Sequence, residues 1–132
     1  MMTFLPEPDF RLSAQCLDRK RLGSQRLEAK ILFRVLNNEI VAPQSKIVKM
    51  WKGYENALAL YHDLVIEEWV SRGYANNMPF MKPEGEIIFP PWFGDIKVHS
   101  SHRAALLMKD FDWYSKFGWK ELPEIKYYWP VP

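Results

Sequence analysis

Hydrophobic residues recur at three- and four-residue steps along three stretches of the chain, a period typical of helices that bury one face. The first stretch predicts a helix over 24–37, because Gly23 interrupts the run before it and favours a break near Leu22. The second stretch predicts the longest helix, over 46–72, and the third predicts a helix over 97–109. The pattern therefore indicates three principal helices.

The segments between these helices have the composition of irregular structure. Residues 1–12 are expected to form an arm, because prolines exclude regular helix there. Ser13 is a suitable N-cap for a short helix over 13–18. Prolines and glycines punctuate residues 74–96, where only the run 86–89 resembles a strand. The other segments are predicted to be a loop over 38–45, a short turn over 112–117 and an extended aromatic tail from Gly118.

An apolar stripe runs along the longest predicted helix and is rich in aromatic residues. Periodic aromatics of this kind are typical of a small protein core, so we expect the stripe to be buried. His62 lies next to it and is expected to be interfacial or exposed rather than a metal ligand. The stripe consists of Ile47, Trp51, Tyr54, Leu58, Tyr61, Val65 and Trp69.

Length and composition agree with this helical pattern. The 132 residues predict a single domain, and 48% hydrophobic with 15% aromatic residues favours a packed core over disorder. We therefore expect an all-α fold: a compact single-domain helical bundle with long loops and an extended aromatic C-terminal tail. The single cysteine excludes an intramolecular disulfide, and neither a membrane-length apolar run nor a signal-peptide pattern is present. A cytoplasmic monomer without metal or cofactor is the expectation.

The net charge is only +2, but the charges are unevenly distributed. One carboxylate, Glu28, lies within a basic cluster, and helical spacing places it on one flank with Arg21 and Gln25. A carboxylate among cations suits action on a polyanion such as nucleic acid. The alternative is a solvated face on which Glu28 is a surface ion-pair partner. The cluster consists of Arg19, Lys20, Arg21, Arg26 and Lys30.

Two further groups of residues are candidates for binding. Ser101, His102 and Arg103 are expected at the start of the third helix, where a hydroxyl, an imidazole and a guanidinium would suit an anion. The alternative for them is an ordinary N-cap with polar neighbours. His99 and His102 have metal-ligand spacing, but no further ligand cluster supports a metal site. The aromatic residues of the tail could stack on bases or cover the core.

Several motifs, in this order, resemble those of the pyrimidine-dimer DNA glycosylase (endonuclease V-like) family, in its small phage and bacterial subgroup. They are DRKRLGSQRLEA, KMWKGYENAL, EEWVSRGY, PPWFGD, HSSHRAALLMKD and the ending YYWP. The resemblance spans most of the chain and implies a mainly α-helical domain that binds duplex DNA with damaged pyrimidines.

The resemblance also implies a mechanism. In the family, the α-amine of an N-terminal threonine attacks the sugar, releases the base and forms a Schiff base that permits strand cleavage. Thr3 matches that threonine once translation starts at Met2 and this methionine is removed. Glu28 matches the assisting glutamate, and Arg19, Arg21 and Arg26 match the phosphate contacts. Lys20, Gln25 and the group Ser101, His102 and Arg103 complete the expected substrate-binding residues.

Two other classes of function remain open from the sequence. One is a non-catalytic protein that binds nucleic acid or nucleotides through the same basic surface. The other is an enzyme that cleaves a different N-glycosidic bond, in a modified base or a free nucleotide.

Overall fold

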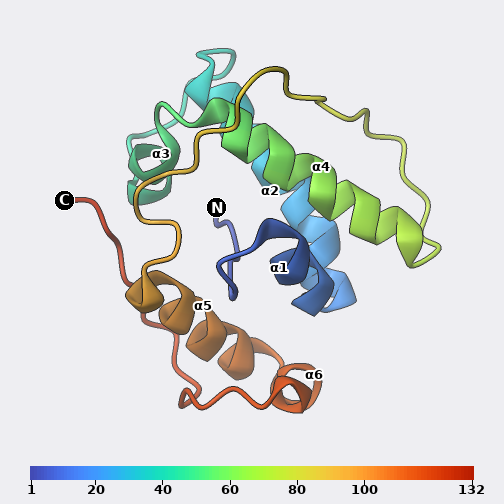
Figure 1. Cartoon of the computed structure of the whole chain (residues 1–132), viewed down its shortest axis with the longest axis vertical. Helices are drawn as coiled ribbons and strands as arrows, with labels where there is room; N and C mark the ends of the chain where they lie inside the picture. Colours follow the sequence, from blue (N-terminus) through green and yellow to red (C-terminus); the bar gives the residue numbers. More distant parts are fainter.

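The computed structural model describes residues 1–132 and contains six α-helices, one short 3-10 helix and no β-strand (Figure 1). The predicted all-α class is therefore confirmed, and the run 86–89 is not a strand. The helices are α1 (Phe10–Cys16), α2 (Arg19–Leu36), α3 (Lys46–Trp51), α4 (Glu55–Ser71), α5 (Ile96–Lys109) and α6 (Phe111–Tyr114), and the 3-10 helix η1 (Ser115–Phe117) follows α6.

Helix α1 begins three residues earlier than the sequence predicted. Its N-cap is Asp9, whose carboxylate accepts a hydrogen bond of 2.8 Å from the backbone N–H of Leu12. Ser13, the predicted cap, lies inside the helix, and its hydroxyl bonds instead to the backbone N–H and C=O of Glu7. The predicted start was wrong because Asp9 and Ser13 are both suitable N-cap residues, and the helix uses Asp9, which lies four residues before Ser13.

Helix α2 is continuous from Arg19, so the predicted break near Leu22 was wrong. Gly23 does not interrupt the helix but allows a close approach to α4. A Cβ atom at this position would lie 3.0 Å from the indole ring of Trp69.

The long helix predicted over 46–72 is two helices, α3 and α4, separated by three residues. Gly53 adopts a φ of 91°, in the left-handed region that favours glycine, and the N–H of Tyr54 bonds to the carbonyl of Trp51 at 2.8 Å. The apolar stripe nevertheless packs as predicted, with five of its seven residues buried. They are Ile47, Trp51, Leu58, Tyr61 and Val65. His62 is also buried, contrary to the prediction, and its Nδ1 lies 2.8 Å from a carboxylate oxygen of Asp63.

The C-terminal part of the chain follows the predicted pattern closely. Helix α5 begins one residue before the predicted range and ends with it. The predicted turn over 112–117 corresponds to α6 and η1, and the tail runs back along α5 (Figure 1). The backbone N–H of Glu124 bonds to the carbonyl of Ala104 at 3.1 Å, which fixes the tail to that helix.

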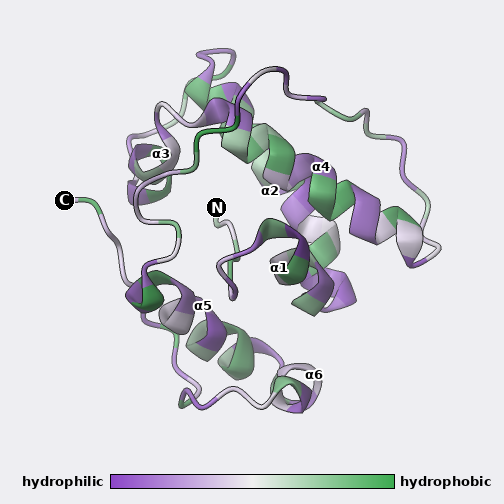
Figure 2. Cartoon of the chain, viewed as in Figure 1, coloured by the Kyte–Doolittle hydropathy of each residue, from purple (hydrophilic) through white to green (hydrophobic).

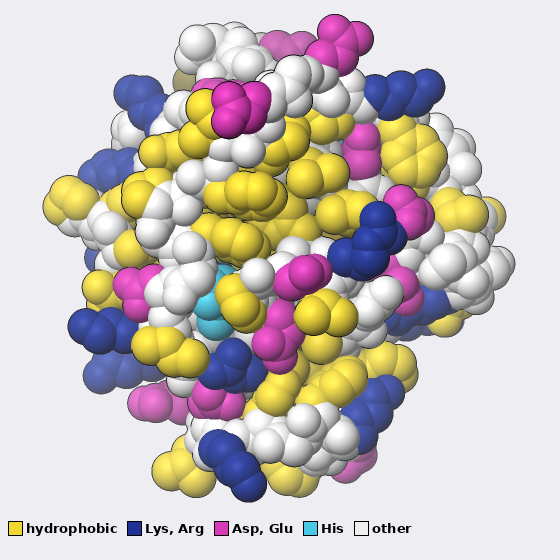
Figure 3. All heavy atoms as spheres, viewed as in Figure 1, with side chains coloured by type: hydrophobic (Ala, Val, Ile, Leu, Met, Phe, Trp, Pro, Cys, Tyr) yellow, Lys and Arg dark blue, Asp and Glu magenta, His cyan; other side chains and the backbone are white.

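The helices are arranged around the N-terminal arm. Figure 1 shows α2 and α4 crossing side by side, α1 next to them, and α5 and α6 on the other side of the arm. Both α4 and α5 contain hydrophobic and hydrophilic residues (Figure 2), and each helix buries part of its surface in the core. On the face in Figure 3, hydrophobic side chains gather at the centre and Lys and Arg side chains stand apart. None of the helices has the length and apolar character needed to span a bilayer.

Candidate active site

The N-terminal arm is irregular, as predicted, but its residues 2–5 are buried in the core. Gln25 of α2 holds two of its peptide groups. The Gln25 amide oxygen accepts from the N–H of Phe4 at 2.9 Å, and its amide nitrogen donates to the carbonyl of Met2 at 2.9 Å. Tyr61 of α4 donates to the carbonyl of Phe4 at 3.0 Å and to the Gln25 oxygen at 2.6 Å. Gln25 was predicted to bind substrate, and these contacts give it a positioning role for the arm.

Two histidines of α5 hold the next residue of the arm. The N–H of Leu5 donates to Nδ1 of His102 at 3.0 Å, and its carbonyl lies 2.8 Å from Nδ1 of His99. Gly94 donates its N–H to Nε2 of His99 at 2.9 Å, so the proton of His99 lies on Nδ1. Burial lowers the pKa of both imidazoles, that of His102 to about 3. Both rings are therefore neutral at physiological pH, and each uses its Nδ1 atom to hold the backbone of Leu5.

The arm brings a backbone nitrogen to Glu28. The N–H of Met2 donates to one carboxylate oxygen of Glu28 at 3.1 Å, and the side chain of Gln25 donates to the other at 3.2 Å. Met2 is 8% exposed, whereas Met1 is 48% exposed. The chain thus emerges from the core at Met1, immediately beyond the nitrogen that Glu28 contacts.

Thr3, the nucleophile expected from the resemblance, lies one residue further into the core. It is fully buried, and its hydroxyl accepts a hydrogen bond of 3.1 Å from the indole N–H of Trp51. Its own backbone nitrogen is one peptide unit away from the nitrogen that Glu28 contacts. The catalytic role of Thr3 stays a prediction.

Two more groups lie near Glu28. Arg21, predicted on the same flank of α2, is paired with Asp18 at 3.3 Å. Tyr127 of the tail packs against Phe4, with 6.4 Å between ring centroids. Burial raises the pKa of Tyr127, the charge of Glu28 raises it further, and Arg21 lowers it. The carboxylate of Glu28 therefore has neighbouring groups from α2, from the arm and from the tail.

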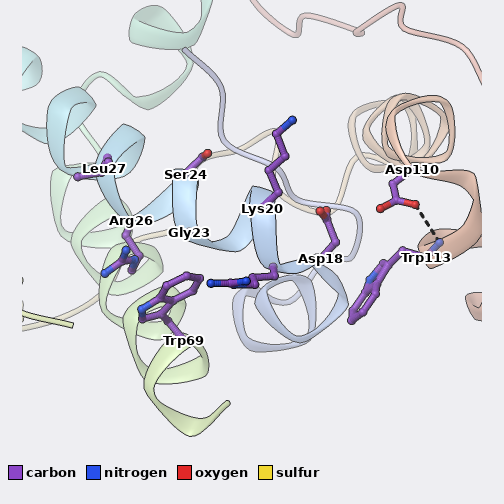
Figure 4. A pocket seen from close by; sticks show the side chains of 10 residues that line it. Asp18, Lys20, Gly23, Ser24, Arg26, Leu27, Trp69, Asp110 and Trp113 are labelled. Carbon is purple, nitrogen blue, oxygen red and sulfur yellow. Dashed lines mark hydrogen bonds between the residues drawn. The ribbon is translucent and has the colours of Figure 1, made fainter. Parts of the chain in front are cut away.

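Three of the four remaining cations of the predicted cluster face a different direction. Arg19, Lys20 and Arg26 line an open pocket of about 630 Å³ between α2, the end of α4 and α6 (Figure 4). Helical spacing places this pocket on the side of α2 away from Arg21, Gln25 and Glu28. The sequence therefore predicted the basic cluster but not its division into two faces.

Aromatic rings lie against two of the cations of this basic pocket. The guanidinium of Arg26 lies over the ring of Trp69, 4.2 Å from its centroid, and that of Arg19 lies over Tyr74 at 4.9 Å. Arg26 also donates to the side chain of Asn76 at 2.8 Å, while its Nε is buried without a partner. Burial lowers the pKa of Arg26. Cations stacked on aromatic rings are suited to contacts with phosphates and bases.

The residues Ser101, His102 and Arg103 do not open a helix, so their predicted position was wrong. Helix α5 begins at Ile96, with Asp95 as its N-cap. The hydroxyl of Ser101 donates to the carbonyl of Val98, and Arg103 donates to the carbonyl of Pro6 at 2.7 Å. Arg103 also pairs with Glu121 at 2.9 Å. Phosphate binding by these residues stays a prediction, and it would require Arg103 to leave its partners in the arm and the tail.

The comparison with protein families gives one match. The sequence model of a family described as pyrimidine dimer DNA glycosylase matches residues 1–82. The chain belongs to this family. The resemblance inferred from the sequence motifs is thereby confirmed, and it places the protein among DNA-repair glycosylases. No curated protein and no solved structure matches the chain.

The part of the chain matched to pyrimidine dimer DNA glycosylases contains the arm, Glu28 and the cations of α2. Helix α5 and the tail lie beyond it, and they supply His99, His102 and Tyr127. The sequence predicted His102 as a substrate-binding residue, whereas His99 and Tyr127 were not predicted as parts of the site. Histidines three residues apart on a helix were a visible signal, but only the fold shows that they hold the arm.

Proposed function

We propose that this protein is a DNA N-glycosylase with abasic-site lyase activity, acting on damaged pyrimidines in duplex DNA through an N-terminal amine. The supporting observation is the distance of 3.1 Å between the nitrogen of residue 2 and the carboxylate of Glu28. In a chain that begins at residue 2, this nitrogen is the α-amine. A chain that begins at Thr3 would use the nucleophile expected from the resemblance.

The first chemical step is attack of the neutral amine on C1′ of the sugar. An α-amine has a pKa near 8, so a useful fraction is neutral at physiological pH. The N–C1′ bond forms as the bond between C1′ and the pyrimidine nitrogen breaks, and the base leaves with the electron pair and takes a proton from water. The carboxylate of Glu28 accepts the proton that the amine loses and stabilises positive charge at the sugar.

The second step opens the sugar and cleaves the strand. The protonated Glu28 returns its proton to O4′ as the C1′–O4′ bond breaks, which leaves a protonated imine between C1′ and the amine. Removal of a proton from C2′ then expels the 3′ phosphate by β-elimination. The regenerated carboxylate of Glu28 is the group available to accept that C2′ proton.

The basic pocket supplies the contacts to the DNA backbone in this proposal. Arg19 and Lys20 are exposed, and Arg26 is stacked on Trp69, so their charges are available to phosphates on the side of α2 away from the amine. A strand that crosses α2 would contact these cations while its damaged nucleotide reaches Glu28.

Borohydride trapping on a duplex that contains one abasic site tests the proposal, because only an amine nucleophile leaves a covalent adduct. Chains that begin at Met1, Met2 and Thr3 should be compared. We expect the Met2 chain to form the adduct at least tenfold faster than the Met1 chain, whose amine lies one residue beyond Glu28. Faster trapping by the Thr3 chain would assign the nucleophile to Thr3. DNA binding without an adduct from any of the three would favour the non-catalytic alternative.

A further inference from the structure

Asp18 is a buried carboxylate that does not make the hydrogen bond expected of its position. It is the N-cap residue of α2, where an aspartate usually accepts a hydrogen bond from a backbone N–H of the first turn. No such bond is present, although Asp9, the N-cap of α1, makes one. Asp18 is only 5% exposed. Its carboxylate must be paired elsewhere, because a buried charge without a partner is strongly destabilising.

Two side chains pair with this carboxylate. One oxygen accepts a hydrogen bond from the hydroxyl of Tyr114 in α6, and the other accepts from Nη1 of Arg21 at 3.3 Å. The hydroxyl of Tyr114 also accepts from the backbone N–H of Asp18 at 3.0 Å. Tyr114 is fully buried, and its ring stacks on that of Trp119 with 5.6 Å between centroids. Burial and the bond to Asp18 raise the pKa of Tyr114, so its hydroxyl keeps its proton and remains a donor.

Arg21 is fixed at one end of its guanidinium and open at the other. Only Nη1 makes a hydrogen bond within the protein, whereas Nε and Nη2 make none, and the side chain is 18% exposed. Glu28 lies two helical turns along the same flank of α2, and the charges of Arg21 and Glu28 both act on the hydroxyl of Tyr127. A guanidinium with free N–H groups beside Glu28 is suited to bind a phosphate there.

We infer that Asp18 and Tyr114 are positioning residues for the proposed reaction. They hold Arg21 so that its open end binds a phosphate next to the attacked sugar, which places C1′ against the amine. The inference rests on the proposed function and gives a role to α6, which lies beyond the matched part of the chain, 1–82. Arg21 touches the substrate, whereas Asp18 and Tyr114 act only through Arg21.

Asp18→Asn separates the orientation of Arg21 from its attraction for DNA. The variant keeps an acceptor for Tyr114 but loses the charge that holds the guanidinium. In the most active of the three chains compared above, we expect trapping at saturating abasic duplex to slow about tenfold or more, because the phosphate is no longer aligned with the amine. Affinity for the duplex should be kept or raised, because a negative charge is removed. Asp112→Asn, which removes an exposed charge from α6, is the control and should leave the trapping rate unchanged.

A double-mutant cycle determines whether the effect passes through Arg21. Arg21→Ala should slow trapping at least as much as Asp18→Asn, and the double variant should match Arg21→Ala within about twofold. Tyr114→Phe retains the ring stacked on Trp119 and loses only the hydroxyl, so it keeps the test available if Asp18→Asn does not fold. It should slow trapping when Arg21 is present but not in the Arg21→Ala background.

The alternative is a structural contact that only holds α6 against α2. It predicts that Asp18→Asn and Tyr114→Phe slow trapping by the same factor with and without Arg21. That result, or no slowing by either variant, would overturn the inference while leaving the proposed function intact. Absence of trapping by all three unsubstituted chains would instead contradict the proposed function, and the inference would fail with it.

Discussion

Glu28 is the only acidic residue of α2, and its two oxygens contact the nitrogen of residue 2 and the side chain of Gln25. In a chain that begins at Met2, Glu28→Gln should lower base release about a hundredfold or more, because it removes a charge that acts mainly in the transition state. Affinity for DNA should be kept or raised. The near-isosteric amide retains an acceptor for residue 2, so we expect stability to change by less than about 1 kcal/mol.

Single-turnover kinetics and a binding titration check this prediction, with Glu39→Gln, an exposed site beyond the end of α2, as the matched control. Full activity of Glu28→Gln would exclude Glu28 from the mechanism and leave it the role of a surface or positioning group.

Residues on one flank of a helix could be predicted from the sequence, whereas their partners could not. Helical spacing placed Gln25 and Glu28 together, and the structure confirms this through their hydrogen bond. The contacts of the arm connect residues 26 positions apart for Met2 and Glu28 and 97 apart for Leu5 and His102. No local period encodes such pairs, because they depend on how the helices pack.

At the scale of elements, α2 separates the amine site from the basic pocket, so its charges can be tested independently of the chemistry. Arg26→Ala should weaken DNA binding and reduce the steepness of its salt dependence by about 0.9 on a log–log plot for each phosphate that the variant no longer binds. Adduct formation at saturating DNA should persist, because Arg26 lies away from Glu28. Titrations at several salt concentrations measure this, with the exposed Arg34→Ala on the same helix as control. If the DNA affinity and its salt dependence were both unchanged, this face of α2 would be exposed to solvent without binding DNA.

The limits of the helices were harder to predict than their existence. The apolar spacing of the stripe continues through residues 46–72, but Gly53 breaks the backbone there by adopting a positive φ. Gly23 has the opposite role, because it stays helical and makes room for Trp69. The same residue type thus ends one helix and permits close packing of another. Only the tertiary contacts distinguish these two cases.

At the scale of the whole molecule, the arm is the element that joins the two parts of the fold. Helices α2, α3 and α4 hold it on one side through Gln25, Trp51 and Tyr61, and α5 holds it on the other through His99 and His102. The position of the amine therefore depends on contacts made by nearly every helix. A disturbance of α5 should reach Glu28 through the arm, although α5 does not contact Glu28 directly.

Acid should disturb this connection through the histidines. Burial lowers the pKa of His102 to about 3 and also lowers that of His99, so the unfolded chain binds protons that the folded protein does not. The stability that the neutral rings provide is complete above the ordinary histidine pKa of about 6.5. It is lost progressively as the pH falls from there toward 3. His102 alone should lower the free energy of unfolding by about 1.4 kcal/mol per pH unit in this window, and His99 acts in the same direction.

Urea unfolding at pH 7.5, 6, 5 and 4 measures this slope, and His102→Asn is the informative variant. The asparagine oxygen can replace Nδ1 as acceptor for the N–H of Leu5 but does not titrate in this range. The variant should be less stable than the unsubstituted protein at pH 7.5, because the smaller side chain leaves a cavity. Its stability should nevertheless fall less steeply with acid, by about 1.4 kcal/mol per pH unit. Parallel pH profiles for the two proteins would show that His102 does not control the acid sensitivity of the arm.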